Sequence, residues 1–423
     1  MTAPLPRVWA ALGGAAADLA RLTVTGPTTT LTSTFAVTDA GVAAVGASLL
    51  AATDGAVALD TRRLAVALRS ERYLLRDGRS PGSPFDPLST FHRTADGWIR
   101  LHANYPWHRA AALRVLHCAE EEVPAAIAGR AGVELENALH ATGGVAAAVR
   151  TAASWRSEYG VAPPLVEHRV VGDAPPRPAR RPRVLDLTRV IAGPVATRTL
   201  AVHGADVLRL DPPDRPEIPL QALDTLPGKR SALLDLRDTA TREELLAGAD
   251  VVVTGYRPGA LDRFGLAPGA LARRHPGLVV VTLSAWGEQG PWGRRRGFDS
   301  LVQAACGIAV AEGRADGTPG ALPAQVLDHA TGYLAAAAAL LALRRQRREG
   351  GTHHVRLSLV GTASWLQGLP RPAPRPVPEV DPEPHLERVG PLTLASPPGT
   401  VDGRPLHWPP PPPSFGTEEP RWR

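Results

Sequence analysis

The 423-residue sequence is short of several residue types, and each shortage excludes a class of structure. Two cysteines, Cys118 and Cys306, are too few for a disulfide framework or a cysteine-rich metal cluster, so we predict two core residues and no metal site. The most apolar run, Leu334 to Leu343, is about half as long as the ~20 residues of a membrane span. The first residues lack a basic n-region, so we expect no signal peptide and a soluble, cytoplasmic protein without a membrane partner.

Lysine is almost absent. Lys229 is the single lysine, and the remaining basic residues among the 47 Lys and Arg are arginines, giving a formal net charge of +6. A skew this uniform, together with 41 Gly and 43 Pro, indicates G/C-rich coding bias. A nucleic-acid-binding protein clusters its basic residues on one face, whereas these arginines are spread among 41 acidic residues. We therefore predict no nucleic-acid partner.

The remaining composition predicts a folded chain with more than one domain. Hydrophobic residues make up 44% of the sequence, enough for a sizeable core, and a single core rarely grows past about 250–300 residues. Residues 183–360 alternate strand-like and helix-like patterns, which indicates a parallel sheet covered by helices. The predicted strands are Val184–Leu187, Val207–Leu210, Ser231–Leu236, Asp250–Val253, Leu278–Leu283 and Val355–Leu359. The predicted helices are Pro194–His203, Thr241–Leu246, Leu261–Arg274 and Ala330–Arg348.

We predict an α/β fold: a Rossmann-like parallel sheet with helices on both faces, plus a small α+β domain. The predicted units are an N-terminal helical and strand segment (1–85), the small domain (86–171), a Pro- and Arg-rich linker (172–182), the Rossmann-like domain (183–368) and a Pro-rich closing segment (369–423). In the small domain, residues 97–102 alternate as a strand, and helices are expected from His108 and Gly144. By composition alone, the closing segment is disordered or polyproline-like.

The N-terminal segment contains a weak internal repeat of the main domain. The sequence predicts an apolar helix over Val37–Ala52, with Asp39 before its apolar part, and then a strand over Ala56–Leu59. The order of an Asp, an apolar helix, a Gly-containing turn and a strand also occurs from Asp328 onward. Chance among so many alanines is the alternative, and we interpret Asp39 as a helix N-cap.

One candidate anion site lies between the first predicted strand and the helix after it. The stretch from Arg189 to Pro194 places backbone N–H groups where α/β folds bind anions. It lacks the GxGxxG spacing of a dinucleotide site, so an ordinary strand-to-helix turn is the alternative. Asp211, which ends the second strand, reads as a surface residue rather than a ribose ligand.

Two further candidates carry basic side chains. Gly228-Lys229-Arg230 enters a strand, and a lysine is a compact charge suited to a phosphate. Arg257 and Arg263 follow the strand that ends at Val253, at the ligand-binding edge of a parallel sheet. An exposed basic turn and a Pro-Gly turn are the respective alternatives.

Asp328 is the candidate nucleophile. It stands between a short apolar stretch and the long Ala/Leu helix, where an Asp N-cap contributes ~1 kcal/mol over Ala. A helix N-terminus also favours the charged carboxylate, which could attack an activated acyl group while neighbouring N–H groups hold the oxyanion. Capping and catalysis are compatible.

Together these motifs resemble family III of the CoA-transferases (the CaiB/BaiF group), which includes formyl-CoA transferase and α-methylacyl-CoA racemase. The resemblance rests on the order and spacing of seven motifs over residues 183–360. They are Val184–Pro194, Gly204–Val207, Gly228–Ser231, Tyr256–Gly259, Leu261–Leu266, Gly297–Ala304 and Asp328-His329. Pro409–Pro413 with Phe415–Thr417 resembles the family's closing segment, which implies an ordered tail.

The resemblance implies a role for each matching residue. Asp328 would take the acyl group of an acyl-CoA and then the CoA, as an aspartyl-CoA thioester, before passing CoA to a small carboxylic acid. Acyl-CoA is then a substrate, with no permanently bound cofactor. The residues implied to hold CoA are Val190, Ala192, Gly193, Pro194, Lys229, Tyr256, Arg257 and Arg263.

Three departures from the family leave alternatives open. Phe298 stands where the racemase branch has a histidine, which favours a transferase over an acyl-CoA racemase or isomerase. Gly255 replaces a frequent asparagine. The small domain precedes the Rossmann-like half instead of following it, which keeps a non-catalytic CoA-binding protein open. The resemblance implies a homodimer; alternatively the fused N-terminal copy takes the partner's place.

Overall fold

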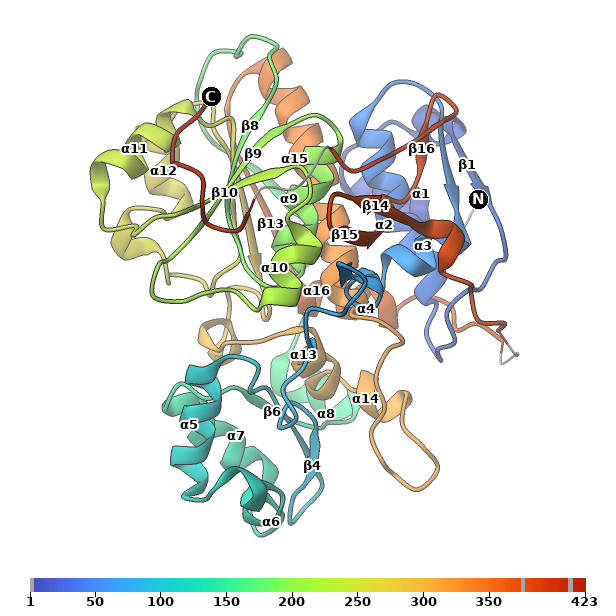
Figure 1. The fold of residues 1–423 in the computed structure, drawn as a ribbon, viewed down its shortest axis with the longest axis vertical. Helices are drawn as coiled ribbons and strands as arrows, with labels where there is room; N and C mark the ends of the chain where they lie inside the picture. Colours follow the sequence, from blue (N-terminus) through green and yellow to red (C-terminus); the bar gives the residue numbers. More distant parts are fainter. Residues whose placement is uncertain (1–3, 374–376, 410–413) are drawn as a thin grey trace.

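The computed structural model describes residues 4–373, 377–409 and 414–423. Its centre is a seven-stranded sheet in the order β10-β9-β8-β11-β12-β13-β7, parallel except for the edge strand β7 (Figure 1). Numbered from β8 onward, the six parallel strands follow the doubly wound order 3-2-1-4-5-6. This confirms the predicted α/β class. The strands are β7 (Glu167–Gly172), β8 (Arg183–Leu187), β9 (Asp206–Asp211), β10 (Lys229–Leu233), β11 (Val251–Thr254), β12 (Val279–Ser284) and β13 (Thr352–Ser358).

Helices cover both faces of this sheet because its strands are apolar on both sides. Val184 and Val251 point to the face that packs against α9 (Ala192–Val202) and α15 (Val326–Glu349). Leu185 and Val252, the next residues along the same strands, point to the opposite face. That face packs against α11 (Thr239–Gly248) and α12 (Pro268–Arg274).

The α15 helix is the central helix of the core. Its length and hydropathy are those of a helix that could cross a membrane, but 89% of its most apolar window is buried inside the protein. It packs against α9 and against α2 (Val37–Ala52), and α16 (Leu359–Gln367) follows it after β13. We therefore interpret α15 as a core helix.

The N-terminal segment lies against α15 and reproduces the edge of the main sheet. β1 (Leu22–Thr25) pairs in parallel with β2 (Val57–Asp60), and β16 (Thr400–Val401) pairs antiparallel with β2. The main sheet has the same arrangement in β12, β13 and antiparallel β7. The remaining helices of the segment are α1 (Pro4–Ala11), α3 (Thr61–Ala67) and α4 (Ser70–Tyr73).

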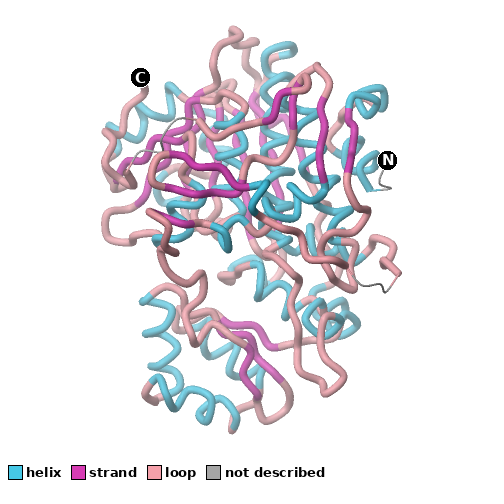
Figure 2. Tube along the Cα trace, turned by 45° about the vertical axis from the view of Figure 1, so that its right-hand side comes forward, coloured by secondary structure: helices cyan, strands magenta, loops and turns pink. Residues whose placement is uncertain are grey.

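A small α+β unit lies below the main sheet in Figures 1 and 2. A three-stranded antiparallel sheet, β4-β5-β6, packs against helices of the same unit. The helix expected from Gly144 is not there, because residues 146–148 pair with β5 as β6. The elements are β4 (Phe91–Arg93), β5 (Trp98–Leu101), α5 (Pro106–Leu116), α6 (Val123–Ala128), α7 (Gly132–Ala141), β6 (Ala146–Ala148) and α8 (Ala152–Tyr159).

The tail is ordered in its described part, contrary to its composition. β14 (Leu386–Val389) and β15 (Leu392–Ala395) form a sheet with β3 (Leu75–Arg76), and β17 (Arg404–Pro405) extends the N-terminal sheet through β16. Composition misses this because β15 and β16 pair with β3 and β2, which lie over 300 residues away in the sequence. Residues 410–413 of the predicted closing Pro run lie outside the described residues.

Several element boundaries differ from prediction; α15 begins at Val326 instead of Ala330, and β13 begins at Thr352 instead of Val355. The helix expected over Leu261–Arg274 is interrupted at Gly265, whose φ of +71° ends a short turn before α12 begins. β10 begins at Lys229, because residues 229–233 pair in register with β9.

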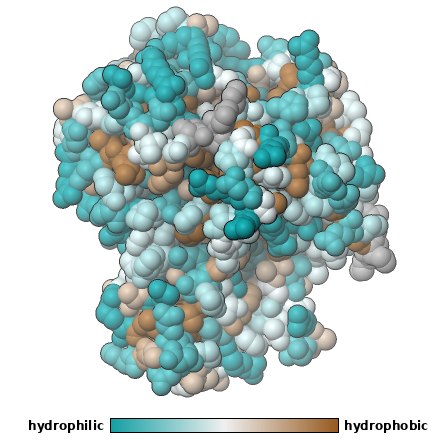
Figure 3. Space-filling view, viewed as in Figure 1, coloured by the Kyte–Doolittle hydropathy of each residue, from teal (hydrophilic) through white to brown (hydrophobic). Residues whose placement is uncertain are grey.

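The surface of the face seen in Figure 1 is mostly hydrophilic, with apolar side chains in small separate patches (Figure 3).

Candidate active site

A cavity of about 1060 Å³ opens at the carboxyl ends of the parallel strands. It lies between the main sheet and the small α+β unit, the edge where α/β folds bind ligands. Seven of the nine residues predicted to form the site line it. They are Val190, Ala192, Gly193, Tyr256, Arg257, Arg263 and Asp328.

Asp328 is buried at the end of this cavity, in the first turn of α15. The helix begins at Val326 with Gln325 at the N-cap position, so the prediction that Asp328 is the cap is wrong. Its side chain is 6% exposed. Burial raises the pKa of Asp328 well above its usual range, and the nearby carboxylates of Asp299 and Glu71 raise it further. The expectation that the helix end simply keeps it charged is therefore corrected.

Asp299 supplies the capping interaction that Asp328 does not. It begins α13 (Asp299–Ala305), and its Oδ2 accepts a hydrogen bond from the Asp328 backbone N–H at 3.0 Å. Gln303 donates to its Oδ1. Burial raises the pKa of Asp299 to about 6. The backbone N–H of Asp328 itself is thus already bonded to Asp299.

The turn after β8 approaches the cavity with a strained backbone. Val190 has a φ of +69°, which is rare for a β-branched residue. Its N–H donates to Glu217 Oε2 at 2.9 Å, and this bond holds the turn. A Cβ on Gly193 would lie 2.3 Å from the Cβ of Thr188, so only glycine fits there. The sequence motif therefore encodes one particular loop shape.

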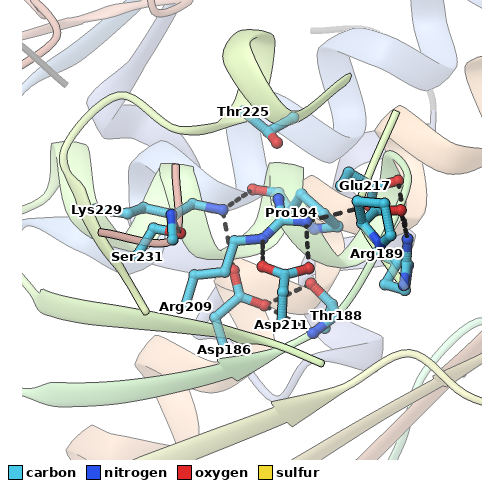
Figure 4. A network of polar contacts seen from close by, with 12 residues as sticks. Asp186, Thr188, Arg189, Pro194, Arg209, Asp211, Glu217, Thr225, Lys229 and Ser231 are labelled. Carbon is cyan, nitrogen blue, oxygen red and sulfur yellow. Dashed lines mark hydrogen bonds and ion pairs between the residues drawn. The ribbon is translucent and has the colours of Figure 1, made fainter. Parts of the chain in front are cut away.

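Lys229 does not reach the cavity, which corrects the predicted phosphate contact. Its Nζ donates to Asp186 Oδ2 at 3.0 Å and to the Pro194 carbonyl at 2.9 Å, with the lysine side chain fully buried (Figure 4). Burial lowers the pKa of Lys229 to about 8, although Asp186 opposes that shift. Lys229 and Pro194 fasten the start of α9 to the sheet from behind, so they shape the turn and do not line the cavity.

The same network corrects the interpretation of Asp211. The residue is buried, and its carboxylate forms a two-pronged ion pair with Arg209, with bonds of 2.7 and 3.0 Å (Figure 4). Arg209 also donates to Glu217, at 3.1 Å. A buried ion pair of this kind fixes the ends of β9 and leaves no surface carboxylate for a ribose.

The cavity is strongly cationic. Four lining arginines form no ion pair with a carboxylate in the described part of the chain: Arg215, Arg257, Arg263 and Arg296. Burial lowers the pKa of Arg296, and the positive charges of Arg257 and Arg215 lower it further. Since mutually repelling, unpaired arginines are costly in a cleft, this wall is suited to a polyanionic ligand.

Comparison with known proteins decides the family. Residues 182–373 match the family model described as CoA-transferase family III. A probable fatty acyl-CoA transferase of Mycobacterium tuberculosis is 32% identical over 267 residues, which cover 55% of this chain and 68% of that protein. The chain belongs to family III of the CoA-transferases.

Other comparisons also match less than half of this family III chain. A succinyl-CoA–D-citramalate CoA-transferase of Chloroflexus aurantiacus is 32% identical over 192 residues, 42% of this chain and 48% of that one. The crystal structure of the same Mycobacterium tuberculosis protein is 33% identical and the match covers 46% of this chain and 58% of that one, with a TM-score of 0.42. The chain spans about half or less of the length of several other curated relatives that it matches.

In this family III chain, the small unit supplies a cavity wall that the sequence gave no reason to expect. Tyr105, Trp107 and His108, around the start of α5, line the cavity opposite Asp328's half. Tyr105 stacks on Trp107 at 4.7 Å between ring centroids, and its hydroxyl donates to Glu217 at 2.5 Å. These residues carry no motif that could have marked them in the sequence.

Phe298, which stands where the resemblance implies a histidine in a racemase, packs against two imidazoles. His102 stacks on Phe298 with ring centroids 3.7 Å apart, and His108 lies edge-on at 5.9 Å. Burial lowers the pKa of His102 well below its usual value, and it lowers that of His108 to about 3. Both rings are therefore neutral near pH 7, and neither matches a proton shuttle at that pH.

Neither cysteine belongs to the site. Cys306 is buried and Cys118 half-buried, and both are free thiols. Among the described residues there is no group of three or more His, Cys, Asp or Glu side chains that could hold a metal ion.

Proposed function

We propose that this chain is a CoA-transferase that moves CoA from an acyl-CoA to a carboxylic acid through Asp328. The observation that carries the proposal is a buried carboxylate, Asp328, in the wall of a large cavity that arginines also line. A carboxylate nucleophile and cations for the ligand's phosphates are the two parts such a transfer needs.

The proposed reaction has two matched halves. An Asp328 oxygen attacks the acyl carbonyl carbon, the C–S bond breaks, and CoA leaves as a thiolate. The thiolate attacks the side-chain carbonyl carbon of Asp328, and the donor acid leaves as a carboxylate that carries one Asp328 oxygen. The acceptor carboxylate then repeats both steps in reverse and restores the Asp328 carboxylate. Each step exchanges one bond for another, without an oxidant or reductant.

The surroundings of Asp328 fit these steps. Burial and the nearby carboxylates destabilise the Asp328 anion, which raises its pKa. Once ionised, a destabilised carboxylate is a stronger nucleophile. Arg257 and Arg263 line the cavity without a carboxylate partner among the described residues, so they are available for phosphates. Tyr256, Tyr105 and Trp107 add aromatic surface to the same cavity.

A transfer assay tests the proposal against its two alternatives. Purified protein is incubated with panels of acyl-CoA donors and carboxylic acids in D₂O, and the new thioesters are identified by mass spectrometry. We expect a new acyl-CoA without deuterium at its α-carbon. Deuterium wash-in without transfer would support a racemase or isomerase instead, and CoA binding with neither reaction would support a non-catalytic binding protein.

A further inference from the structure

The N-terminal segment reaches the surroundings of the candidate nucleophile. Glu71 of α4 lies with its Oε2 3.4 Å from Nε2 of His329, the residue directly after Asp328. Glu71 is 7% exposed and His329 is fully buried. Neither side chain lines the cavity. A carboxylate from residues 4–85 therefore lies within the core of the Rossmann-like half, beside its reactive residue.

The helix that carries Glu71 is fixed to the Rossmann-like half by a second buried network. The Ser70 hydroxyl donates to Asp224 Oδ2 at 2.8 Å, and Arg198 Nη2 donates to the Ser70 hydroxyl at 3.1 Å. Arg198 Nη1 also donates to Asp224 Oδ2, at 3.0 Å. Arg198 belongs to α9 and Asp224 to α10 (Pro219–Thr225). Because the neighbour of Glu71 is bonded on both sides, the position of Glu71 is closely constrained.

The contact between Glu71 and His329 matters because of the charged groups around Asp328. The ionisable groups that face it are Asp299 of α13 and Glu71 of α4, and both are carboxylates. His329 is the basic side chain among them, and its Nδ1 has no hydrogen-bond partner within the described residues. An unpaired carboxylate at Glu71 would be costly to bury, so its contact with the imidazole stabilises the arrangement.

We propose that Glu71 is a positioning residue for Asp328, holding the His329 imidazole so that the N-terminal segment forms part of the active site. This inference rests on the proposed function. It assigns to the fused segment a direct part in the site, through a side chain that touches neither CoA nor the acids. The role is electrostatic as well as geometric, because the Glu71 charge acts on Asp328.

The test uses the whole 423-residue chain with the substitutions Glu71→Gln and Glu71→Ala. The control is Asp54→Asn, which also removes one carboxylate from the N-terminal segment, but from a side chain that is 90% exposed. The rate of CoA-adduct formation on Asp328 is measured against pH. Glu71→Gln removes a like charge, so the pKa of Asp328 falls and the acidic limb moves to lower pH by roughly 0.5–1 unit. Asp54→Asn leaves the profile unchanged.

Glu71→Ala separates positioning from stability. We expect kcat to fall about tenfold with an unchanged KM for acyl-CoA, and Glu71→Gln to restore much of kcat, because glutamine keeps a hydrogen-bonding oxygen. Wild-type profiles and kcat in both variants, or a change in melting temperature alone, would overturn the role of Glu71. Ring ¹⁵N signals of His329, which shift in Glu71→Ala and not in the control, report the contact independently. Absence of any adduct in the wild-type protein would instead overturn the proposed function itself.

Discussion

The N-terminal α2–β2 unit and the α15–β13 unit are built on one scheme, yet only the second forms a site. Each helix carries an Asp as its third residue, Asp39 in α2 and Asp328 in α15. The strand that follows each helix pairs in parallel with a neighbouring strand, β2 with β1 and β13 with β12. Asp39 is half-buried and outside the cavity, whereas Asp328 is buried and lines it.

The difference lies in what stands in front of each helix. Asp328 has Asp299 on its backbone N–H, the Val190 turn beside it and the aromatic wall of the small unit opposite. Asp39 is not the helix cap that its sequence predicts, since Ala36 occupies that position. An aspartate in the first turn of an apolar helix therefore makes no reactive site by itself; the neighbouring elements do.

The largest effect expected from this comparison is on turnover. Asp328→Asn keeps the shape of the side chain and removes the nucleophile, so transfer falls at least about a thousandfold. Asp39→Asn, its match in α2, stays within about twofold of the wild-type rate because Asp39 lies outside the cavity. Steady-state transfer assays on both variants check this, and a comparable loss in Asp39→Asn would break the comparison.

The second-largest expected effect is a difference in stability when a glycine of each helix is replaced by alanine. A Cβ on Gly332 of α15 would lie 2.6 Å from the backbone oxygen of Ala192, which cannot move cheaply, so Gly332→Ala should lower stability by about 1–3 kcal/mol. A Cβ on Gly46 of α2 would meet only the tip of Leu22, at 2.9 Å. There, a gain in helix propensity of about 1 kcal/mol offsets the crowding. Urea unfolding measures both, and equal losses would contradict the difference.

The smallest expected effect is on the pH dependence of stability. A raised pKa means that folding favours protonated Asp328, so its contribution to stability is fully present below the unfolded pKa and is lost as pH rises through the folded pKa. Asp328→Asn removes this loss, and its melting temperature relative to wild type should increase from pH 5 to pH 8. Burial also raises the pKa of Asp39, so Asp39→Asn should show the same sign with a smaller change. A pH-independent difference in Asp328→Asn would contradict the assignment.

The sequence predicted what depends on local pattern. Val-rich strands and the Ala/Leu helix predicted the main sheet and α15, and the ordered motifs led to Asp328 and six other residues that line the cavity. It did not predict that Lys229 is buried against Asp186, because a basic residue that enters a strand looks the same whether it faces solvent or a buried carboxylate. Such a choice depends on side chains that only the fold brings together.

Long-range contacts account for the other differences. Glu71 and His329 are 258 residues apart, and β16 pairs with β2 across more than 300 residues. Asp299 was part of a matched motif, but its bond to the Asp328 N–H depends on where α13 and α15 meet. Residues such as Tyr105 and Trp107 carry no motif of their own, and their place on the cavity wall comes from docking of the small unit.

The most direct test of the central claim is to locate the covalent intermediate. The protein is incubated with acyl-CoA and no acceptor, treated with hydroxylamine or left untreated, digested, and analysed by peptide mass spectrometry. The account predicts CoA, or its hydroxylamine product, on Asp328, with Asp39 unmodified as the internal comparison. Bound CoA with no modification of Asp328, or modification of Asp39 instead, would contradict it.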